Sequence, residues 1–149
     1  MSESESGRGA LVFGADHAGL ELKNALIERA RARGFSVVDV GTHDAASADY
    51  PDFAHEVSRR VAAGEGRGVL VCGTGIGMSI AANRHAGVRA ALCTEPFGAR
   101  MTRLHNDANV LCLGSRITGP GLAEEIFDVF VDTSFEGGRH SRRVSKIEG

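Results

Sequence analysis

The sequence predicts an α/β fold, a three-layer α/β/α sandwich built around a five-stranded parallel sheet. Five short apolar runs alternate with segments of helical pattern along the chain, which is the order that a parallel sheet with helical crossovers requires. The runs are apolar without interruption, as strands buried on both faces are. Twenty of the 149 residues are glycine. They gather between the runs, where the backbone must turn tightly or approach a ligand.

Length and charge limit the classes of protein to which the chain can belong. A chain of 149 residues has the size of one domain, so we expect residues 9–149 to form a single domain with a basic C-terminal tail. Residues 1–8 are polar and rich in Ser and Glu, which predicts a disordered N-terminal extension. The net charge is −2, with no Trp and one Tyr. We therefore expect neither nucleic acid nor a membrane as a partner.

The cysteine pattern indicates the compartment. Cys72, Cys93 and Cys112 are widely spaced, so they form neither a disulfide framework nor a paired-cysteine zinc site. The acidic N-terminus lacks the apolar segment of a secretory signal. A cytoplasmic, reducing location is the resulting expectation.

The first third of the chain predicts two strands and one helix. Ala10–Phe13 is an apolar run that ends at a glycine, which is typical of a strand. Leu20–Arg33 carries apolar residues on one helical face and stops before Gly34, so a helix is predicted there. Ser36–Val40 is the second predicted strand, and the polar segment Gly41–Pro51 is the loop that follows it.

The middle of the chain repeats this alternation. Asp52–Ala63 has apolar residues at every fourth position, which predicts a helix. Gly68–Val71 is the third predicted strand and runs directly into a cluster of glycines. Met78–Asn83 has the pattern of a short helix, and Val88–Cys93 is the fourth predicted strand.

The last third predicts two helices and the final strand. Pro96–His105 is predicted to be a helix, because proline is tolerated in a first turn. Val110–Leu113 is the fifth strand and Gly121–Val131 a further helix, and the tail from Thr133 is polar and basic. Open parallel sheets bind ligands beyond the carboxyl ends of their strands. We therefore expect every candidate chemical group to lie just after a strand.

The segment Gly14–Gly19 follows the first predicted strand and opens a helix. Free N–H groups and the positive end of the helix dipole attract anions at such a start. His17 is therefore a candidate contact for a phosphate or a sugar hydroxyl. The alternative is that Asp16 only caps the helix and His17 is merely exposed.

The strongest motif is VCGTGIGMS at residues 71–79. Its alternate glycines, Gly73, Gly75 and Gly77, expose successive backbone N–H groups and predict an anion nest. No Gly-Lys-Ser/Thr follows, and Met78 stands where a dinucleotide fingerprint has its third glycine. Nucleotide binding is therefore disfavoured.

Cys72 stands at the mouth of this predicted nest. The N–H dipoles there stabilise a thiolate, which can act as a base or as a nucleophile. The alternative for Cys72 is a small buried hydrophobe, which is the preferred interpretation of Cys93 and Cys112.

The segment Arg103–Asp107 places His105, Asn106 and Asp107 at the predicted end of a helix. These residues offer an acid–base group and two hydrogen-bonding side chains. The alternative is a helix C-cap, with a positively charged histidine meeting the dipole.

The segment Gly137–Arg143 carries arginines on a flexible glycine hinge, which suits bidentate binding of a phosphate. The alternative is a solvated basic tail. Arg139 and Arg143 are four residues apart and would share one helical face, which weakens that alternative.

Taken together, five ordered motifs resemble the type B ribose-5-phosphate isomerase family, which also contains galactose- and allose-6-phosphate isomerases. The resemblance runs from Ala10 to about Ile147. The motifs that carry it are GADHAG (14–19), ADYPDFA (48–54), LVCGTGIGMSIAANR (70–84), RLHNDANVLCLGSR (103–116) and EGGRHSRR (136–143). It implies a Rossmann-like or flavodoxin-like sandwich that works as a homodimer or a dimer of dimers, with active sites shared between subunits.

The resemblance also implies roles for single residues. Cys72 matches the base that moves a proton between C2 and C1, and Thr74 matches the group that holds the enediolate oxygens. His105 matches the residue that opens the sugar ring. The residues that match contacts to substrate or phosphate are Asp16, His17, Tyr50, Gly73, Gly75, Gly77, Asn106, Arg139 and Arg143, with Arg116 as a possible contact from the partner chain. A sister branch uses a glutamate four positions after Cys72, where this chain has Ile76.

The expected function is therefore interconversion of ribose 5-phosphate and ribulose 5-phosphate through an enediolate, with Cys72 as base and with neither cofactor nor metal. One alternative is an isomerase of allose 6-phosphate, galactose 6-phosphate or a tetrulose 4-phosphate. Another is a non-catalytic module that binds sugar phosphates. A nicotinamide oxidoreductase is disfavoured by the incomplete glycine fingerprint.

Overall fold

The computed structural model describes residues 8–149, so residues 1–7 of the predicted extension lie outside the described residues. Arg8, the last residue of that extension, has defined contacts. Its guanidinium pairs with Asp132 at 2.7 Å, and its backbone N–H donates to the carbonyl of Gly34 at 3.1 Å. The chain is therefore fixed from Arg8 onward.

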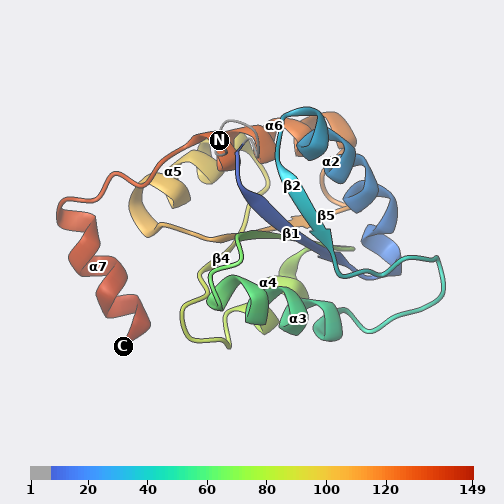
Figure 1. Cartoon of the computed structure of the whole chain (residues 1–149), viewed down its shortest axis with the longest axis horizontal. Helices are drawn as coiled ribbons and strands as arrows, with labels where there is room; N and C mark the ends of the chain where they lie inside the picture. The colour runs from blue at the N-terminus through green and yellow to red at the C-terminus, as the bar shows by residue number, and fades with distance from the viewer. Residues whose placement is uncertain (1–7) are drawn as a thin grey trace.

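Five parallel strands form one sheet in the order β2-β1-β3-β5-β4, as Figure 1 shows in part. The strands are β1 (Ala10–Ala15), β2 (Ser36–Asp39), β3 (Arg67–Cys72), β4 (Ala90–Leu92) and β5 (Val110–Gly114). The residues of β1, β3 and β5 are almost all fully buried, because helices cover both faces. The predicted number and direction of strands are confirmed.

Helices form the two outer layers. They are η1 (His17–Gly19), α2 (Leu20–Ala32), α3 (Tyr50–Ala62), α4 (Ile76–Ala82), α5 (Pro96–Asn106), α6 (Pro120–Asp132) and α7 (Arg139–Glu148). One core cluster joins the sheet to α2, α5 and α6, and a second joins it to α3 and α4. Figure 1 shows these two groups on opposite sides of the strands. None of the helices within residues 8–149 has the length and apolar character to cross a bilayer.

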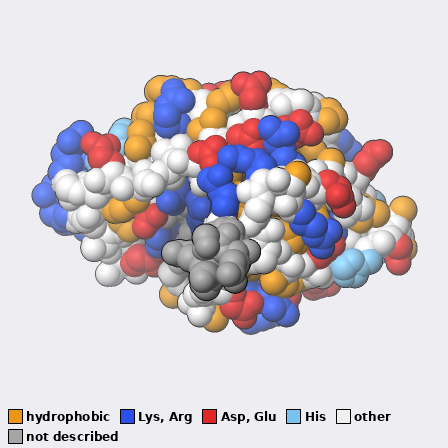
Figure 2. All heavy atoms as spheres, turned by 45° about the horizontal axis from the view of Figure 1, so that its top comes forward, with side chains coloured by type: hydrophobic (Ala, Val, Ile, Leu, Met, Phe, Trp, Pro, Cys, Tyr) orange, Lys and Arg blue, Asp and Glu red, His pale blue; other side chains and the backbone are white. Residues whose placement is uncertain are grey.

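Ion pairs tie two helices of one outer layer together. Arg29 and Arg33 of α2 bind Asp128 of α6, and Arg33 also binds Asp132 at 2.8 Å. The hydrogen bond from Arg29 lowers the pKa of Asp128 below its usual value. Figure 2 shows the resulting mixture of basic and acidic side chains across the top face of the molecule.

The C-terminal segment differs most from its prediction. It is predicted as a polar tail, but residues from Arg139 to Glu148 form the helix α7, which projects from one end of the molecule (Figure 1). The carboxylate of Glu148 holds this helix, because it accepts the N–H of Gly87 at 2.9 Å and binds Arg89 at 2.6 Å. Smaller differences are a shorter β4, and helices α3 and α4 that begin two residues earlier than predicted.

Candidate active site

A cavity of about 450 Å³ opens at the carboxyl edge of the sheet, beside the ends of β1, β3 and β5. Its volume lies in the range of small-molecule sites. Its lining residues are Asp16, Tyr50, Cys72, Gly73, Thr74, Ile76, Gly77, Ile80 and Arg116. Seven of these nine are residues that the sequence predicts to touch substrate, so the structure brings them together around one cavity after the third strand.

The loop after β3 holds the sulfur of Cys72 at this cavity. The backbone N–H of Gly75 donates to Cys72 Sγ at 3.1 Å. Gly75 has a φ of +79°, and a Cβ there would lie 2.8 Å from the carbonyl carbon of Leu113. Both the backbone conformation and the lack of space require glycine at this position. The loop is thereby fixed in the shape that brings an amide to the sulfur.

Two amides of the predicted anion nest are already engaged within the loop. The N–H of Gly75 donates to Cys72, and the N–H of Ile76 donates to Thr74 Oγ1 at 3.2 Å. The Thr74 side chain is exposed, and its hydroxyl retains a proton to donate when its oxygen accepts the amide. Ile76 turns an apolar side chain to the cavity, so no carboxylate stands at the position that the sister branch uses.

One close contact shapes a wall of the cavity. A Cβ on Gly73 would lie 3.3 Å from the Nη1 atom of Arg116, so the Arg116 side chain lies along the loop of its own chain. The expectation that Arg116 reaches a site from the partner chain is therefore corrected, because it lines the cavity of the same chain. Its position follows from β5 pairing directly with β3, which places residues after Gly114 beside Cys72.

The segment after β1 supplies Asp16 and His17. Asp16 is buried and accepts the N–H of Gly19 at 3.1 Å, so it caps the short helix η1 and also lines the cavity. His17 is exposed, and its Nδ1 accepts the N–H of Ala48 at 3.1 Å. The neutral ring therefore carries its proton on Nε2, and can donate it to a sugar or phosphate oxygen.

A second group of predicted site residues lies outside the Cys72 cavity. His105 stacks on the ring of His140 with 4.2 Å between ring centroids and 17° between planes. The Glu136 carboxylate lies 3.8 Å from Nε2 of His105 and 4.0 Å from Nε2 of His140. Burial, followed by the charge of His105, lowers the pKa of His140 below 6.5. Sequence reasoning missed Glu136 and His140, although both stand in the motif EGGRHSRR.

The predicted phosphate clamp belongs to this second group. Arg139 and Arg143 are exposed on α7, and Arg143 Nη1 lies 3.4 Å from Nδ1 of His140. Basic side chains gather at this end of the molecule (Figure 2). Neither arginine lines the cavity that holds Cys72.

The expectation that every candidate group follows a strand is wrong for His105, Asn106 and the arginines of α7. Helix α5 returns the chain from the carboxyl edge to the amino edge of the sheet, so its last residues precede β5 rather than follow a strand. Helix α7 packs on α5 at that end. In Figure 1 it lies at the end of the molecule opposite the tips of β1 and β2. One chain thus carries two groups of site residues at opposite edges of its sheet.

The remaining thiols are buried, as predicted. Cys93 and Cys112 are 4% and 0% exposed. Burial raises the pKa of the Cys93 thiol to about 11 and raises that of Cys112 further. Both are protonated near neutral pH, so neither competes with Cys72 as a base.

A second surface cavity, of about 440 Å³, lies between η1, α2 and the start of α6. Glu21 is the ionisable residue in its lining, which otherwise consists of apolar and hydroxyl-bearing residues. It lacks the convergence of thiol, hydroxyl, carboxylate and guanidinium that the Cys72 cavity has. The Cys72 cavity is therefore the candidate active site.

Comparison with known proteins identifies the family. The profile of the Ribose/Galactose Isomerase family matches residues 11–147. Ribose-5-phosphate isomerase B of Escherichia coli is 47% identical over 138 residues, which cover 92% of this chain and 93% of that protein. The structure of the Clostridium thermocellum ribose-5-phosphate isomerase B superimposes with a TM-score of 0.92 at 48% identity, over 93% of this chain and 95% of that one.

A structure of the Mycoplasma genitalium ribose-5-phosphate isomerase B holds bound ribulose 5-phosphate. It has a TM-score of 0.92 and 41% identity, and the match covers 95% of each chain. The fold, the ordered motifs and these matches along nearly the whole length lead to one conclusion. The chain belongs to the ribose/galactose isomerase family, the family of the type B ribose-5-phosphate isomerases.

Proposed function

We propose that this isomerase interconverts ribose 5-phosphate and ribulose 5-phosphate through an enediolate, with Cys72 as the base and without a cofactor. The observation that carries the proposal is the position of the Cys72 sulfur. It lines a cavity together with a hydroxyl and a guanidinium, and a backbone N–H donates to it. Relatives named for this reaction, one of them holding ribulose 5-phosphate, support the substrate.

Cys72 is favoured over the other titratable groups of the cavity. The Asp16 carboxylate already caps helix η1 through Gly19, and a phenol is in general a weaker acid than a thiol. The N–H of Gly75 favours the thiolate, because a hydrogen bond to a charged form stabilises that form. The thiolate would take the proton from C2 of the open-chain aldose and return it to C1, while the proton of the O2 hydroxyl passes to O1, so that protons and electrons balance.

The charge that develops on the substrate oxygens needs donors. The Thr74 hydroxyl is exposed to the cavity, and Arg116 brings a positive charge to the same wall. Removal of one preorganised donor from a comparable oxyanion site costs roughly 3–4 kcal/mol. We assign Thr74 to the enediolate oxygens on this basis, with Tyr50 beside the sugar.

A second copy of the chain would complete the site. A second group of residues lies at the opposite edge of the sheet. In this group His105 would move the proton that opens the sugar ring, and the arginines of α7 would bind the phosphate. A two-fold dimer places the same surface of each copy on the other, so each copy can lend its second group to the partner's cavity. The phosphate then acts as a handle whose binding energy fixes the sugar over Cys72.

The test is a panel of phosphorylated aldoses, compared by kcat/KM on purified protein in the presence of a chelator and without added cofactor. We expect ribose 5-phosphate to give the highest value. A higher value for allose 6-phosphate, galactose 6-phosphate or a tetrulose 4-phosphate would replace the substrate and keep the reaction class. Binding without turnover of any sugar phosphate would overturn the proposal in favour of a sensing module.

A further inference from the structure

Three ligand atoms of metal-binding type converge where the linker before α7 meets the end of α5. They are the ring nitrogens of His105 and His140 and a carboxylate oxygen of Glu136, and all lie within 4.8 Å of one another. Among the described residues, 8–149, this is the only cluster of three such ligand atoms. Two imidazoles and one carboxylate are a ligand set that zinc uses with water in the fourth position.

One ring nitrogen of the cluster is buried without a hydrogen-bond partner. His140 is 5% exposed, and within the described residues its Nε2 has no hydrogen-bond partner. A buried polar atom without a partner costs free energy. The Glu136 oxygen, at 4.0 Å, is too far for a hydrogen bond to this nitrogen. A cation between the two atoms would satisfy both.

The spacing is close to that of a bound ion. Tetrahedral zinc at its usual bond lengths holds ligand atoms roughly 3.3 Å apart. The two nitrogens lie 3.8 and 4.0 Å from the Glu136 oxygen, so each must approach it by about half an ångström or slightly more. The two rings are stacked with 17° between planes, so the partly exposed His105 ring must also turn for both ring planes to meet at one ion. Glu136 is exposed and precedes two glycines, which leaves it free to make that movement.

The ligand types also suit a metal. Imidazole nitrogen is the commonest metal ligand among protein side chains. The nitrogen-rich set favours zinc and its transition-metal neighbours over magnesium or calcium, which prefer oxygen ligands alone.

We propose that His105, Glu136 and His140 form a binding site for one Zn²⁺ ion per chain, and that the bound ion inhibits isomerisation by occupying Nε2 of His105. The inhibition rests on the proposed function, in which that nitrogen moves a proton. Binding of the ion does not rest on it.

Binding is measured on the full chain by isothermal titration with Zn²⁺, and by Co²⁺ substitution, where intense visible bands report tetrahedral coordination. We expect one ion per chain in the wild type. Glu136→Gln and His140→Asn each remove a direct ligand, so each should weaken binding by at least about a hundredfold, the upper end of the loss seen when a partner of a ligand is removed. Glu136 is exposed, so its variant keeps the fold even where His140→Asn does not.

Two control variants distinguish this site from other thiol and imidazole groups that could bind Zn²⁺. Cys72→Ala removes the cavity thiol, and His85→Asn breaks the other close histidine pair, His55 and His85. Both should bind Zn²⁺ like the wild type. Unchanged affinity in Glu136→Gln and His140→Asn, or loss of the ion in either control, overturns the site.

Activity is a separate readout. Micromolar Zn²⁺ should inhibit the wild type reversibly, with recovery on addition of a chelator, and Glu136→Gln should need at least about tenfold more Zn²⁺ for the same inhibition. Stoichiometric binding without inhibition would keep the site and overturn the blocking of His105. An inactive wild type that still binds one ion would refute the proposed function and leave the metal site standing.

Discussion

The ring of Tyr50 fills the space that a Cβ on Gly77 would need. A Cβ placed there would lie 2.5 Å from Cε1 of the ring and 2.9 Å from its hydroxyl oxygen. Both residues line the candidate active site. The absence of a side chain at Gly77 is thus what allows an aromatic ring from α3 to border the sugar cavity.

We expect Gly77→Ala to displace Tyr50, to raise KM for the sugar phosphate and to lower stability by about 1–3 kcal/mol through overpacking. In a Tyr50→Ala background the same change should be neutral, or stabilising by up to about 1 kcal/mol, because alanine favours the helix. A double-mutant cycle in urea measures the difference. Equal effects in both backgrounds would show that the ring does not restrain position 77.

Replacement of Cys72 by alanine should lower kcat by about 100-fold to 10,000-fold, the usual contribution of a general base, while the unfolding midpoint changes little. Cys93→Ala is the matched control, because its thiol is buried and has a pKa of about 11. That variant should retain kcat and lose some stability. Steady-state kinetics and thermal melts of the two proteins make the comparison. Wild-type turnover in Cys72→Ala would falsify the assignment of the base.

The shared site has a test by mixing two inactive proteins. Cys72→Ala and His105→Asn chains, unfolded and refolded together, should recover about a quarter of wild-type activity, since half of the random dimers contain one intact site of two. Each variant refolded alone should stay inactive. If both residues served the same chain's site, no combination of subunits would restore turnover.

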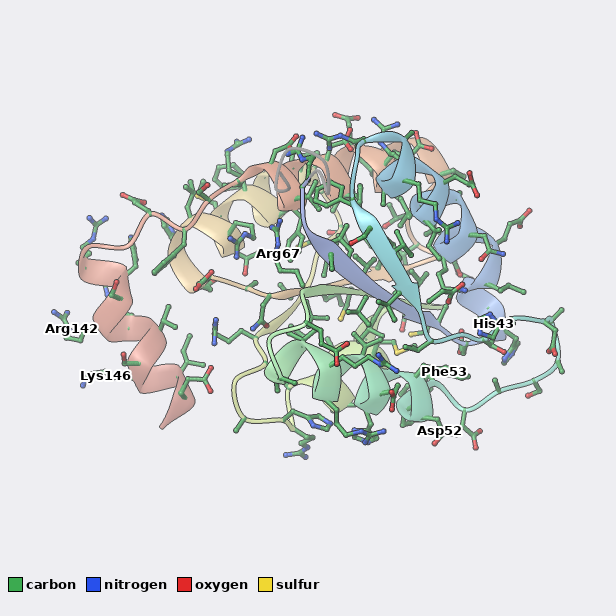
Figure 3. All side chains as sticks on the ribbon, in the orientation of Figure 1. His43, Asp52, Phe53, Arg67, Arg142 and Lys146 are labelled. Carbon is green, nitrogen blue, oxygen red and sulfur yellow. The ribbon has the colours of Figure 1, made fainter. Side chains whose placement is uncertain are left out.

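The arginines of α7 should affect substrate binding more than chemistry. Charge-assisted hydrogen bonds contribute about 1.5–3 kcal/mol each, so Arg139→Ala and Arg143→Ala should each raise KM by roughly tenfold to a hundredfold. Arg142→Ala is the control, because that side chain points away from the body of the molecule (Figure 3). A KM increase of the same size in Arg142→Ala would indicate a general effect of charge rather than a clamp.

Stability should fall in mild acid because of the His55–His85 pair. The ring nitrogens are 2.7 Å apart, and burial, with the charges of His55 and Arg59, lowers the pKa of His85 below 6.5. The unfolded chain then binds more protons than the folded chain between that lowered pKa and about 6.5, so the free energy of unfolding decreases as the pH falls through this window.

Thermal melts between about pH 7.5 and about pH 5.5 measure this decrease. We expect a smaller decrease for His85→Gln, which keeps a hydrogen-bonding side chain and does not titrate there. Some decrease should remain, because the pKa of His140 is lowered too. A pH dependence identical to that of the wild type would exclude His85 as its source.

The layers of the fold could be predicted because apolar patterning and glycine positions are local signals. The strands ending at Ala15 and Cys72 are buried runs followed by turns that contain glycine, and both features stand in the sequence itself. Helix α7 could not be predicted in the same way. It is polar, and Glu148 is held by Gly87 and Arg89, about sixty residues earlier in the chain.

The same difference between local and long-range signals decides which parts of the site could be predicted. The loop at Cys72 is one contiguous motif, so its chemistry could be predicted from the sequence. The place of Arg116 depends on β5 lying beside β3, an order of strands that the pattern of apolar residues does not contain. The cluster of Glu136 and His140 around His105 depends on α7 packing against α5, which follows only from the folded helix.

The division of site residues between two edges of the sheet has a practical consequence for assays. An isolated subunit holds a thiol without its ring-opening partner, so specific activity should decline when the enzyme is diluted below the dissociation constant of its dimer. Rates recorded at very low enzyme concentration would then describe an association equilibrium as much as catalysis.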